Sequence, residues 1–206
     1  MAHESTDTDA QAFAARVDLS TWLYARVPAL REMWGEEIRA RGLGQDPPID
    51  AVVGMFVDQL VGLLPPLLGP FRDQIQPLWD RSAELFGSVA AKRGLAAGEA
   101  IEELHILREL VIRDLYRDPP LGGRVPLSLR EILRLNRALD RAVTHASVGH
   151  LDAMFFEFFE TDDPKILLSG DDVADEASSQ LRSIQSEVDA VLGPEHANAT
   201  CSPRNG

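Results

Sequence analysis

Apolar residues recur every three or four positions along most of this chain, and this spacing most constrains its fold. Side chains three and four positions apart share one face of an α-helix, so each repeat predicts a helix with one buried side. Aromatic residues make up only 6% of the 206-residue sequence, so Leu, Val, Ile and Ala must supply most of the core. That mixture favours helices over strands. We predict an all-α helical bundle in one domain.

Six helices follow from these repeats and from the Gly and Pro residues between them. Ser20 is a candidate N-cap for the first helix. Pro65 and Pro66 should end the second helix, because proline lacks the N–H that a helix interior needs. Pro77 should kink the third helix or split it in two, and Gly94 suits the position after its end. The expected ranges are 20–41, 49–64, 70–93, 97–117, 129–160 and 171–192.

The helix at 129–160 has the clearest start and an unusual length. Ser128 and Glu131 form a capping box, with Leu127 and Ile132 placed as a hydrophobic staple. At 1.5 Å per residue this helix would be about 48 Å long. A small domain does not need that length for its own core, so the helix predicts pairing with another subunit.

Two helices carry the residues that we predict at an interface. Asn136 either fixes the register of paired helices or bonds to a neighbouring backbone. The amphipathic helix 171–192 has nearly three heptads and either pairs between subunits or packs on its own bundle. The aromatic segment 154–159 is either a packed end of the core or a partner contact. The interface candidates are Asn136, Leu139, Val143, His150, Phe155, Leu181, Ile184 and Val188.

The charge of the chain limits its partners. The formal net charge is −13, and affinity for phosphate comes mainly from Lys and Arg. We therefore expect no binding to nucleic acid, unless folding assembles a basic patch. No apolar run approaches the roughly 20 residues that span a bilayer, and residues 1–9 show no signal peptide. These features predict a cytoplasmic protein without a membrane contact.

Motifs of common enzymes are missing from the sequence. Gly122 and Gly123 lack the following Lys and Ser or Thr of a phosphate-binding loop, and there is no nucleophile elbow or zinc helix. Cys201 is the single cysteine, so the chain has no Cys cluster for zinc. We expect no catalytic residue, no resident cofactor and no enzymatic activity.

Three histidines, His105, His145 and His150, stand at positions where a site is conceivable. Glu102 and His105 make one Glu-x-x-His step, whereas di-iron bundles use two, so a solvated helix face is the favoured interpretation over a single metal site. The residues after His105 fit a phosphorylated histidine poorly, which leaves phosphotransfer as a weaker alternative. His145 and His150 diverge by about 140° around a helix and cannot easily share a metal.

His150 has two interpretations. It is either a hydrogen-bonded core histidine or a buried pH-sensitive or ligand-contacting group. His105 and His150 are therefore weak candidates for binding a haem, a tetrapyrrole or another hydrophobic ligand. A ligand-binding helical sensor is the alternative function that they suggest.

The segment 94–109 resembles a bacterial sensory domain. It is similar to the pattern Gly-hydrophobic-Ser-x-x-Glu-hydrophobic-x-x-Glu-Tyr-x-x-Leu-Arg, found at the N-terminus of RsbT co-antagonist proteins of the stressosome and of many sensor histidine kinases. The segment 135–143 and the Trp34-x-x-x-Ile38 step resemble other helices of that family. Leu104 stands where the family usually has Tyr, and Ala97 where it has a capping Ser.

The resemblance implies a helical bundle related to a globin without haem, usually dimeric. It implies a non-enzymatic bacterial signalling module that dimerises and relays a signal to a partner protein, with helix 171–192 as the relay. No kinase, STAS or receiver module follows Phe159. The expected organisation is a flexible leader at 1–18, a sensory and dimerisation domain at 19–160, a connector and amphipathic helix at 161–192, and a disordered tail at 193–206.

Overall fold

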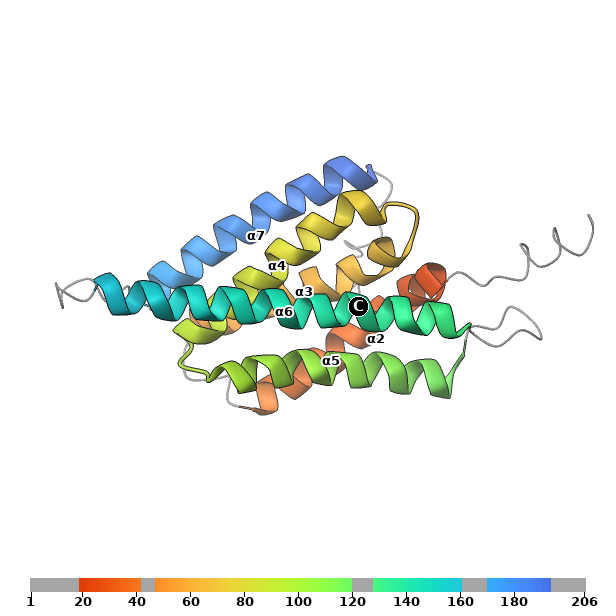
Figure 1. Ribbon diagram of the computed structural model, residues 1–206, viewed down its shortest axis with the longest axis horizontal. Coiled ribbons are helices and arrows are strands. Elements are labelled where there is room, and N and C mark those ends of the chain that lie inside the picture. The colour runs from red at the N-terminus through yellow and green to blue at the C-terminus, as the bar shows by residue number, and fades with distance from the viewer. Residues whose placement is uncertain (1–18, 42–46, 120–127, 161–169, 194–206) are drawn as a thin grey trace, which may run out of the picture.

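The structure, a computed structural model, describes residues 19–41, 47–119, 128–160 and 170–193, with side chains at 156–160 and Gly170 left aside. Its described residues form a helical bundle without strands (Figure 1), which confirms the all-α prediction. The helices are α2 (Leu19–Ala40), α3 (Pro47–Leu68), α4 (Arg72–Lys92), α5 (Ala97–Arg117), α6 (Leu129–Glu160) and α7 (Gly170–Leu192).

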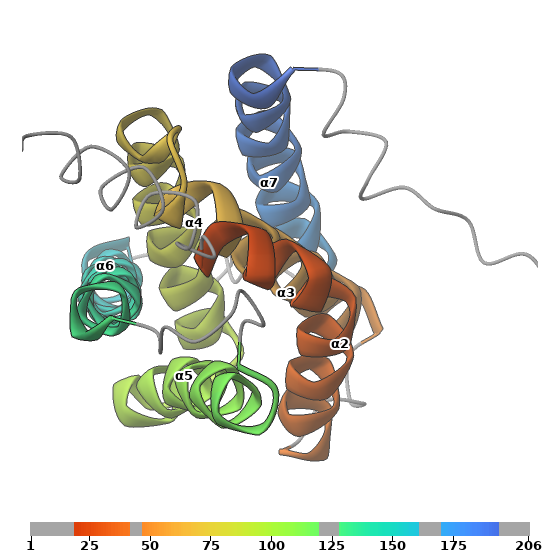
Figure 2. The same ribbon diagram turned by 90° about the vertical axis from the view of Figure 1, so that its right-hand side faces the viewer.

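Helix α3 lies inside the bundle, where α2, α4 and α7 pack against it. Helix α6 packs mainly on α4 and also on α5. It runs parallel to α4 and antiparallel to α5, at one edge of the bundle (Figures 1 and 2). Its C-terminal end projects beyond the start of α5, which agrees with the expectation that α6 exceeds the length of the core.

Helix α3 continues through the two prolines that were expected to end it. It runs to Leu68, so the predicted end at Leu64 is wrong. Leu67 and Leu68 are buried, and each buried Leu contributes about 1.5–3 kcal/mol, which offsets hydrogen bonds lost at the prolines. Ser20, expected as an N-cap, is buried within the first turn of α2, and its Oγ donates to the carbonyl of Pro65 at 2.7 Å.

Helix α3 is also apolar and long enough to cross a membrane, which corrects the expectation that no such run exists. Most of its apolar window is buried against other helices of the bundle. A core helix of a folded domain has the same composition, so this finding is weak evidence for a membrane span.

The sequence predicted a kink or a division at Pro77; helix α4 is one continuous helix, so the division is wrong. Because Pro77 has no N–H, the carbonyl of Asp73 in the first turn receives no hydrogen bond from it. Both residues are exposed, so water can donate a hydrogen bond to that carbonyl instead. Gly94 ends α4 as predicted, with a φ of 77°. The Gly94 N–H donates to Ala91 at 2.8 Å and the Leu95 N–H to Ala90 at 3.1 Å, which is a Schellman motif.

Two further sequence predictions concern the start of α6 and the packing of α7. The capping box is confirmed: the Ser128 N–H donates to Glu131 at 3.1 Å, and the Glu131 N–H to the Ser128 Oγ at 3.3 Å. Leu127 and Cys201 lie outside the described residues.

Helix α7 packs against α3 and α4, so it lies on its own bundle.

Candidate interaction face

The inner side of α6 is fixed to α4 by an unusually close backbone approach. A Cβ atom added to Gly149 would overlap the backbone carbonyl of Glu84, and one added to Gly87 would overlap that of Ala146. Glycine at both positions therefore lets the two helices touch through their backbones. The Trp79 indole N–H adds a hydrogen bond to the carbonyl of Ala138 at 3.0 Å.

Ion pairs flank this crossing. Arg141 of α6 pairs with Asp80 of α4, and that hydrogen bond holds the pKa of the guanidinium above its ordinary value. His145 Nδ1 lies 2.6 Å from Glu84 Oε1, so it donates to this carboxylate. On the other side of α6, Asp140 pairs with Arg108 of α5. These contacts set the rotation of α6 and so decide which of its residues face outward.

The outward side of α6 carries a row of exposed residues, which we call the α6 row. Its members follow one another at intervals of three or four, and its five apolar members are between 43% and 70% exposed. Large apolar side chains gathered on one surface mark an interaction site more often than scattered ones do. The α6 row consists of Leu129, Leu133, Arg137, Asp140, Thr144, Val148, Leu151 and Phe155.

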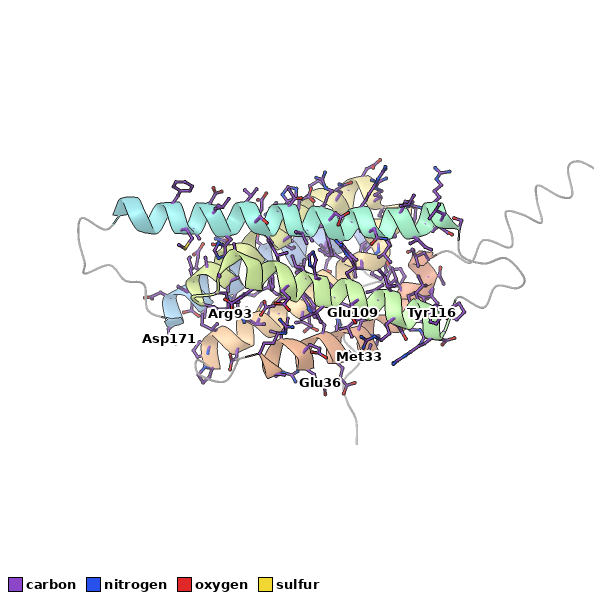
Figure 3. The ribbon with its side chains drawn as sticks, turned by 60° about the horizontal axis from the view of Figure 1, so that its bottom comes forward. Met33, Glu36, Arg93, Glu109, Tyr116 and Asp171 are labelled. Atoms are coloured by element: carbon purple, nitrogen blue, oxygen red, sulfur yellow. The ribbon has the colours of Figure 1, made fainter. Side chains whose placement is uncertain are left out.

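Two side chains of α5 extend this surface. Ile112 is partly exposed and Tyr116 is 89% exposed, the largest value among the exposed large hydrophobic residues described. Tyr116 lies at the end of α5 that neighbours the start of α6 (Figure 3). In the antiparallel register that the Arg108–Asp140 pair indicates, positions 112 and 116 of α5 lie opposite positions 136 and 132 of α6. The apolar surface is therefore broadest at this end of α6.

The structure separates the interface candidates into two groups. Most of them are buried within the chain, and a side chain without exposed surface cannot contact a second subunit unless the helices move. Asn136 Nδ2 donates to the carbonyl of Ile132 at 3.0 Å, which is the backbone alternative raised from the sequence. Phe155 is exposed. The buried candidates are Leu139, His150, Leu181, Ile184 and Val188, whereas Val143 is partly buried.

The two candidate ligand-binding histidines lie in different settings. His150 is buried, and its Nε2 donates to the carbonyl of Leu95 at 2.9 Å, as the core interpretation predicts. Its Nδ1 has no hydrogen-bond partner among the described residues. His105 is exposed, and Glu102 beside it pairs with Arg41 at 3.1 Å, which lowers the pKa of the Glu102 carboxyl. No group of three His, Cys, Asp or Glu residues suited to a metal occurs in the described part of the chain.

Sequence reasoning missed a buried ion pair between α5 and the residue after α4. Arg93 follows the end of α4, and its guanidinium pairs with both oxygens of Glu103 on α5, each at 3.0 Å. Both side chains are at most 9% exposed. The Trp34 indole donates to the backbone carbonyl of Glu103 at 2.8 Å. The spacing of charges gave no signal for this pair, because Arg93 lies outside the periodic part of its helix.

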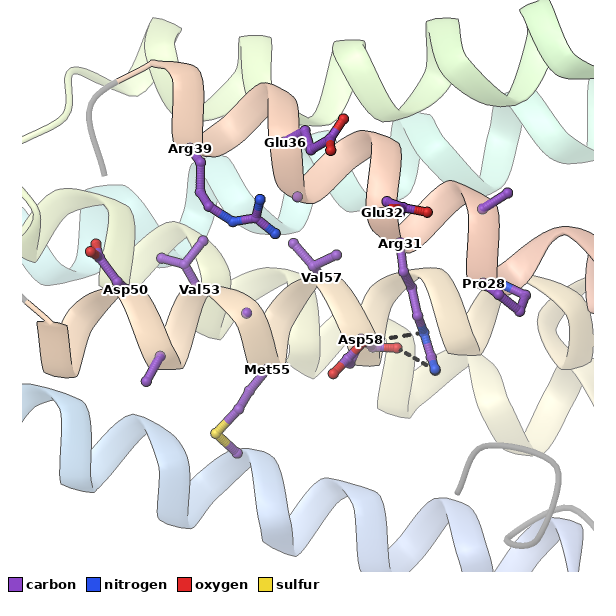
Figure 4. Close-up of a pocket in the computed structure, with 14 residues that line it drawn as sticks. Pro28, Arg31, Glu32, Glu36, Arg39, Asp50, Val53, Met55, Val57 and Asp58 are labelled. Carbon is purple, nitrogen blue, oxygen red and sulfur yellow. Dashed lines mark hydrogen bonds and ion pairs between the residues drawn. The ribbon is translucent and has the colours of Figure 1, made fainter. Parts of the chain in front are cut away.

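A hollow of about 1110 Å³ lies between α2 and α3 (Figure 4). Val53 and Val57 line it together with Arg31, Arg39, Glu32 and Glu36. Neither His105 nor His150 is among its lining residues. The hollow is therefore separate from the predicted ligand-binding residues and from the α6 row.

The chain was also compared with known proteins. No protein-family model matches it, and neither a curated protein nor a solved structure matches it. The resemblance of segment 94–109 to a sensory domain thus remains a prediction from the motif.

Proposed function

We propose that this protein is a non-enzymatic regulatory module that forms a homodimer and relays a signal to a partner protein in the bacterial cytoplasm. The observation that carries the proposal is the α6 row, because its five apolar members stay exposed while the opposite side of α6 packs on α4. Obligate and transient partners alike bury such surfaces. The resemblance of segment 94–109 supports the same conclusion, including a globin-like arrangement and a role in stressosome-type signalling.

The close crossing of α4 and α6 suggests how a signal would pass. Two helices whose backbones touch cannot slide independently, since close-packed contacts switch between discrete arrangements rather than deform. A partner bound at the α6 row would thus act on α4 as well. Helix α7 packs on α4, so movement can reach the helix that the resemblance designates as the relay.

Replacing Leu151 with Asp tests the dimer. A charge at an apolar contact leaves an unpaired group in the interface, so the dissociation constant of the dimer should rise at least about tenfold. Size-exclusion chromatography with light scattering at tens of micromolar measures the mass. The matched control is Ala29→Asp, which adds the same charge to an exposed position on α2. A monomeric wild-type protein, or equal loss of dimer in both variants, would contradict the proposal.

A ligand-binding sensor is the second candidate function. The hollow between α2 and α3 favours it, because its volume is comparable to that of small-molecule sites. Native mass spectrometry of the purified protein should then show a bound small molecule, and an absorption spectrum identifies any haem or tetrapyrrole. A protein mass without any bound ligand would contradict a tightly bound small molecule. If no absorption band appears beyond about 300 nm, even after haem is added, the protein does not bind haem or a tetrapyrrole.

A further inference from the structure

The charges of α6 are distributed unevenly along its length. Residues 129–142 contain four arginines and two acidic residues, whereas Asp152 is the only Asp, Glu, Lys or Arg at 143–155. The first half of the helix is therefore positive in a chain whose net charge is −13. Two copies of such an acidic chain repel each other, and the positive half of α6 is a place where they can approach.

Three of these charges, on Arg130, Arg137 and Asp152, have no ion pair or hydrogen bond with any residue that the structure describes. Arg141, Arg134 and Asp140 are engaged: Arg141 with Asp80, Arg134 with the carbonyl of Leu68, and Asp140 with Arg108. In contrast, Arg137 and Asp152 are exposed and make no ion pair or hydrogen bond with any described residue. An opposite pair of this kind on one helix face is suited to a second copy of the same face.

The α6 row is also symmetric about Thr144. Leu133 and Phe155 each lie eleven positions from Thr144, Arg137 and Leu151 each seven, and Asp140 and Val148 each four. A two-fold axis through Thr144 would therefore map the seven positions of the row from Leu133 to Phe155 onto themselves, as an isologous dimer interface requires, and only Leu129 has no counterpart in the row. Leu133 therefore meets Phe155 of the other copy, and the apolar Leu151 and Val148 lie opposite Arg137 and Asp140.

We infer that a second copy of this chain covers the α6 row, with the two α6 helices antiparallel and the two-fold axis beside Thr144. Leu133 then contacts the partner's Phe155, and the apolar surface broadened by Ile112 and Tyr116 receives that ring. The partner's Leu151 packs on the aliphatic stem of Arg137, whose guanidinium reaches the partner's Asp152. The inference rests on the proposed homodimer and specifies its geometry.

Charge distinguishes this arrangement from a parallel one. Parallel helices in register would place Arg137 next to the partner's Arg137 and Asp152 next to the partner's Asp152. Like charges in contact destabilise an interface, whereas the antiparallel arrangement brings opposite charges together at two equivalent places. Leu133 meets an apolar side chain in both arrangements, so the charges decide the direction.

Disulfide cross-linking tests the direction. With Cys201 replaced by Ser, Thr144→Cys should form an intermolecular disulfide under mild oxidation, because the two copies of residue 144 meet at the axis. Leu133→Cys should cross-link at least about tenfold more slowly, because its two copies lie 22 residues apart, or about 33 Å along the helices. Mixing Leu133→Cys chains with Phe155→Cys chains should give a mixed disulfide. Non-reducing gels score each product.

The outcomes separate this inference from the proposed function. Equal cross-linking of Leu133→Cys and Thr144→Cys would show a parallel pair and overturn the inference. A dimer by light scattering that no cysteine in the row cross-links would place the interface elsewhere, and the proposed homodimer would stand. A monomer, which leaves the row free for a different protein, would overturn both.

Charge exchange gives a second measurement that does not depend on cysteine. Asp152→Arg should weaken the dimer several-fold, because two arginines then face each other at both equivalent places. The double variant Arg137→Asp with Asp152→Arg restores opposite charges and should recover wild-type affinity. A double variant that is no tighter than the single one would contradict the pairing of these residues.

Discussion

Replacing Gly149 with Ala should lower the free energy of unfolding by about 2 kcal/mol or more. The added Cβ overlaps the backbone carbonyl of Glu84, and a backbone cannot move aside as a flexible side chain can. Overpacking typically costs about 1–3 kcal/mol, and an overlap with backbone belongs at or above the upper end of that range, whereas the better helix propensity of Ala returns only about 1 kcal/mol. Denaturant titration should show a lower midpoint with an unchanged slope.

Gly54→Ala is the matched control for this change. Gly54 lies inside α3, and no atom comes within 4 Å of the Cβ that the substitution adds. Without a clash, helix propensity should stabilise the protein by about 0.5–1 kcal/mol. Both variants must be compared at one protein concentration, because a dimer's stability depends on it. An equal change in both variants would show that α4 and α6 do not touch as described.

Local signals in the sequence were sufficient for the bounds of two helices, α5 and α6. The bounds of α5 and α6 were predicted at both ends, since Ser128 with Glu131 and the Pro- and Gly-rich segment after Arg117 are short-range features. The position of Gly94 just after the end of α4 was also predicted, because the positive φ that often ends a helix favours glycine. Each of these depends on residues within one turn of a helix end.

Features that depend on distant residues were not predictable in the same way. Pro65 and Pro66 remain helical because the core buries the residues around them, and no local pattern reports that burial. The apolar stripe of α6 predicted a buried side, but the contact partners of that side lie on α4, some 60 positions earlier. As a result, interface candidates such as Leu139 were core residues, and the exposed Leu151 was missed.

The α6 row itself illustrates the same limit. A helix with apolar residues on two sides shows no clean stripe, so Leu133 and Val148 were not distinguished from core positions. Only the packing of α4 and α5 reveals which side remains free. The candidate face therefore comes from tertiary structure, although the aromatic end at Phe155 and the helix length had pointed to this helix.

Replacing Arg93 with Met should destabilise the fold by about 3–5 kcal/mol. The substitution leaves the Glu103 carboxylate buried without its partner, and an uncompensated buried charge is far more costly than the pair is stabilising. Met fills much of the volume of the aliphatic stem of Arg93. The loss of stability therefore comes from the unpaired charge of Glu103 and not from a cavity. For a chain of this size the melting temperature should fall by roughly 6–20 °C.

Two further variants show whether the buried charge is the cause. Arg93→Met combined with Glu103→Leu removes both charges and should recover most of the loss, because apolar replacements of a buried pair are often neutral or better. Arg113→Met breaks the exposed pair with Glu109 on the same helix, α5, and should cost no more than about 0.5 kcal/mol. The contact of Trp34 with the Glu103 carbonyl is a backbone contact and persists in all three variants. If the double variant were as unstable as Arg93→Met alone, the loss would come from packing at the end of α4, and the electrostatic explanation would be wrong.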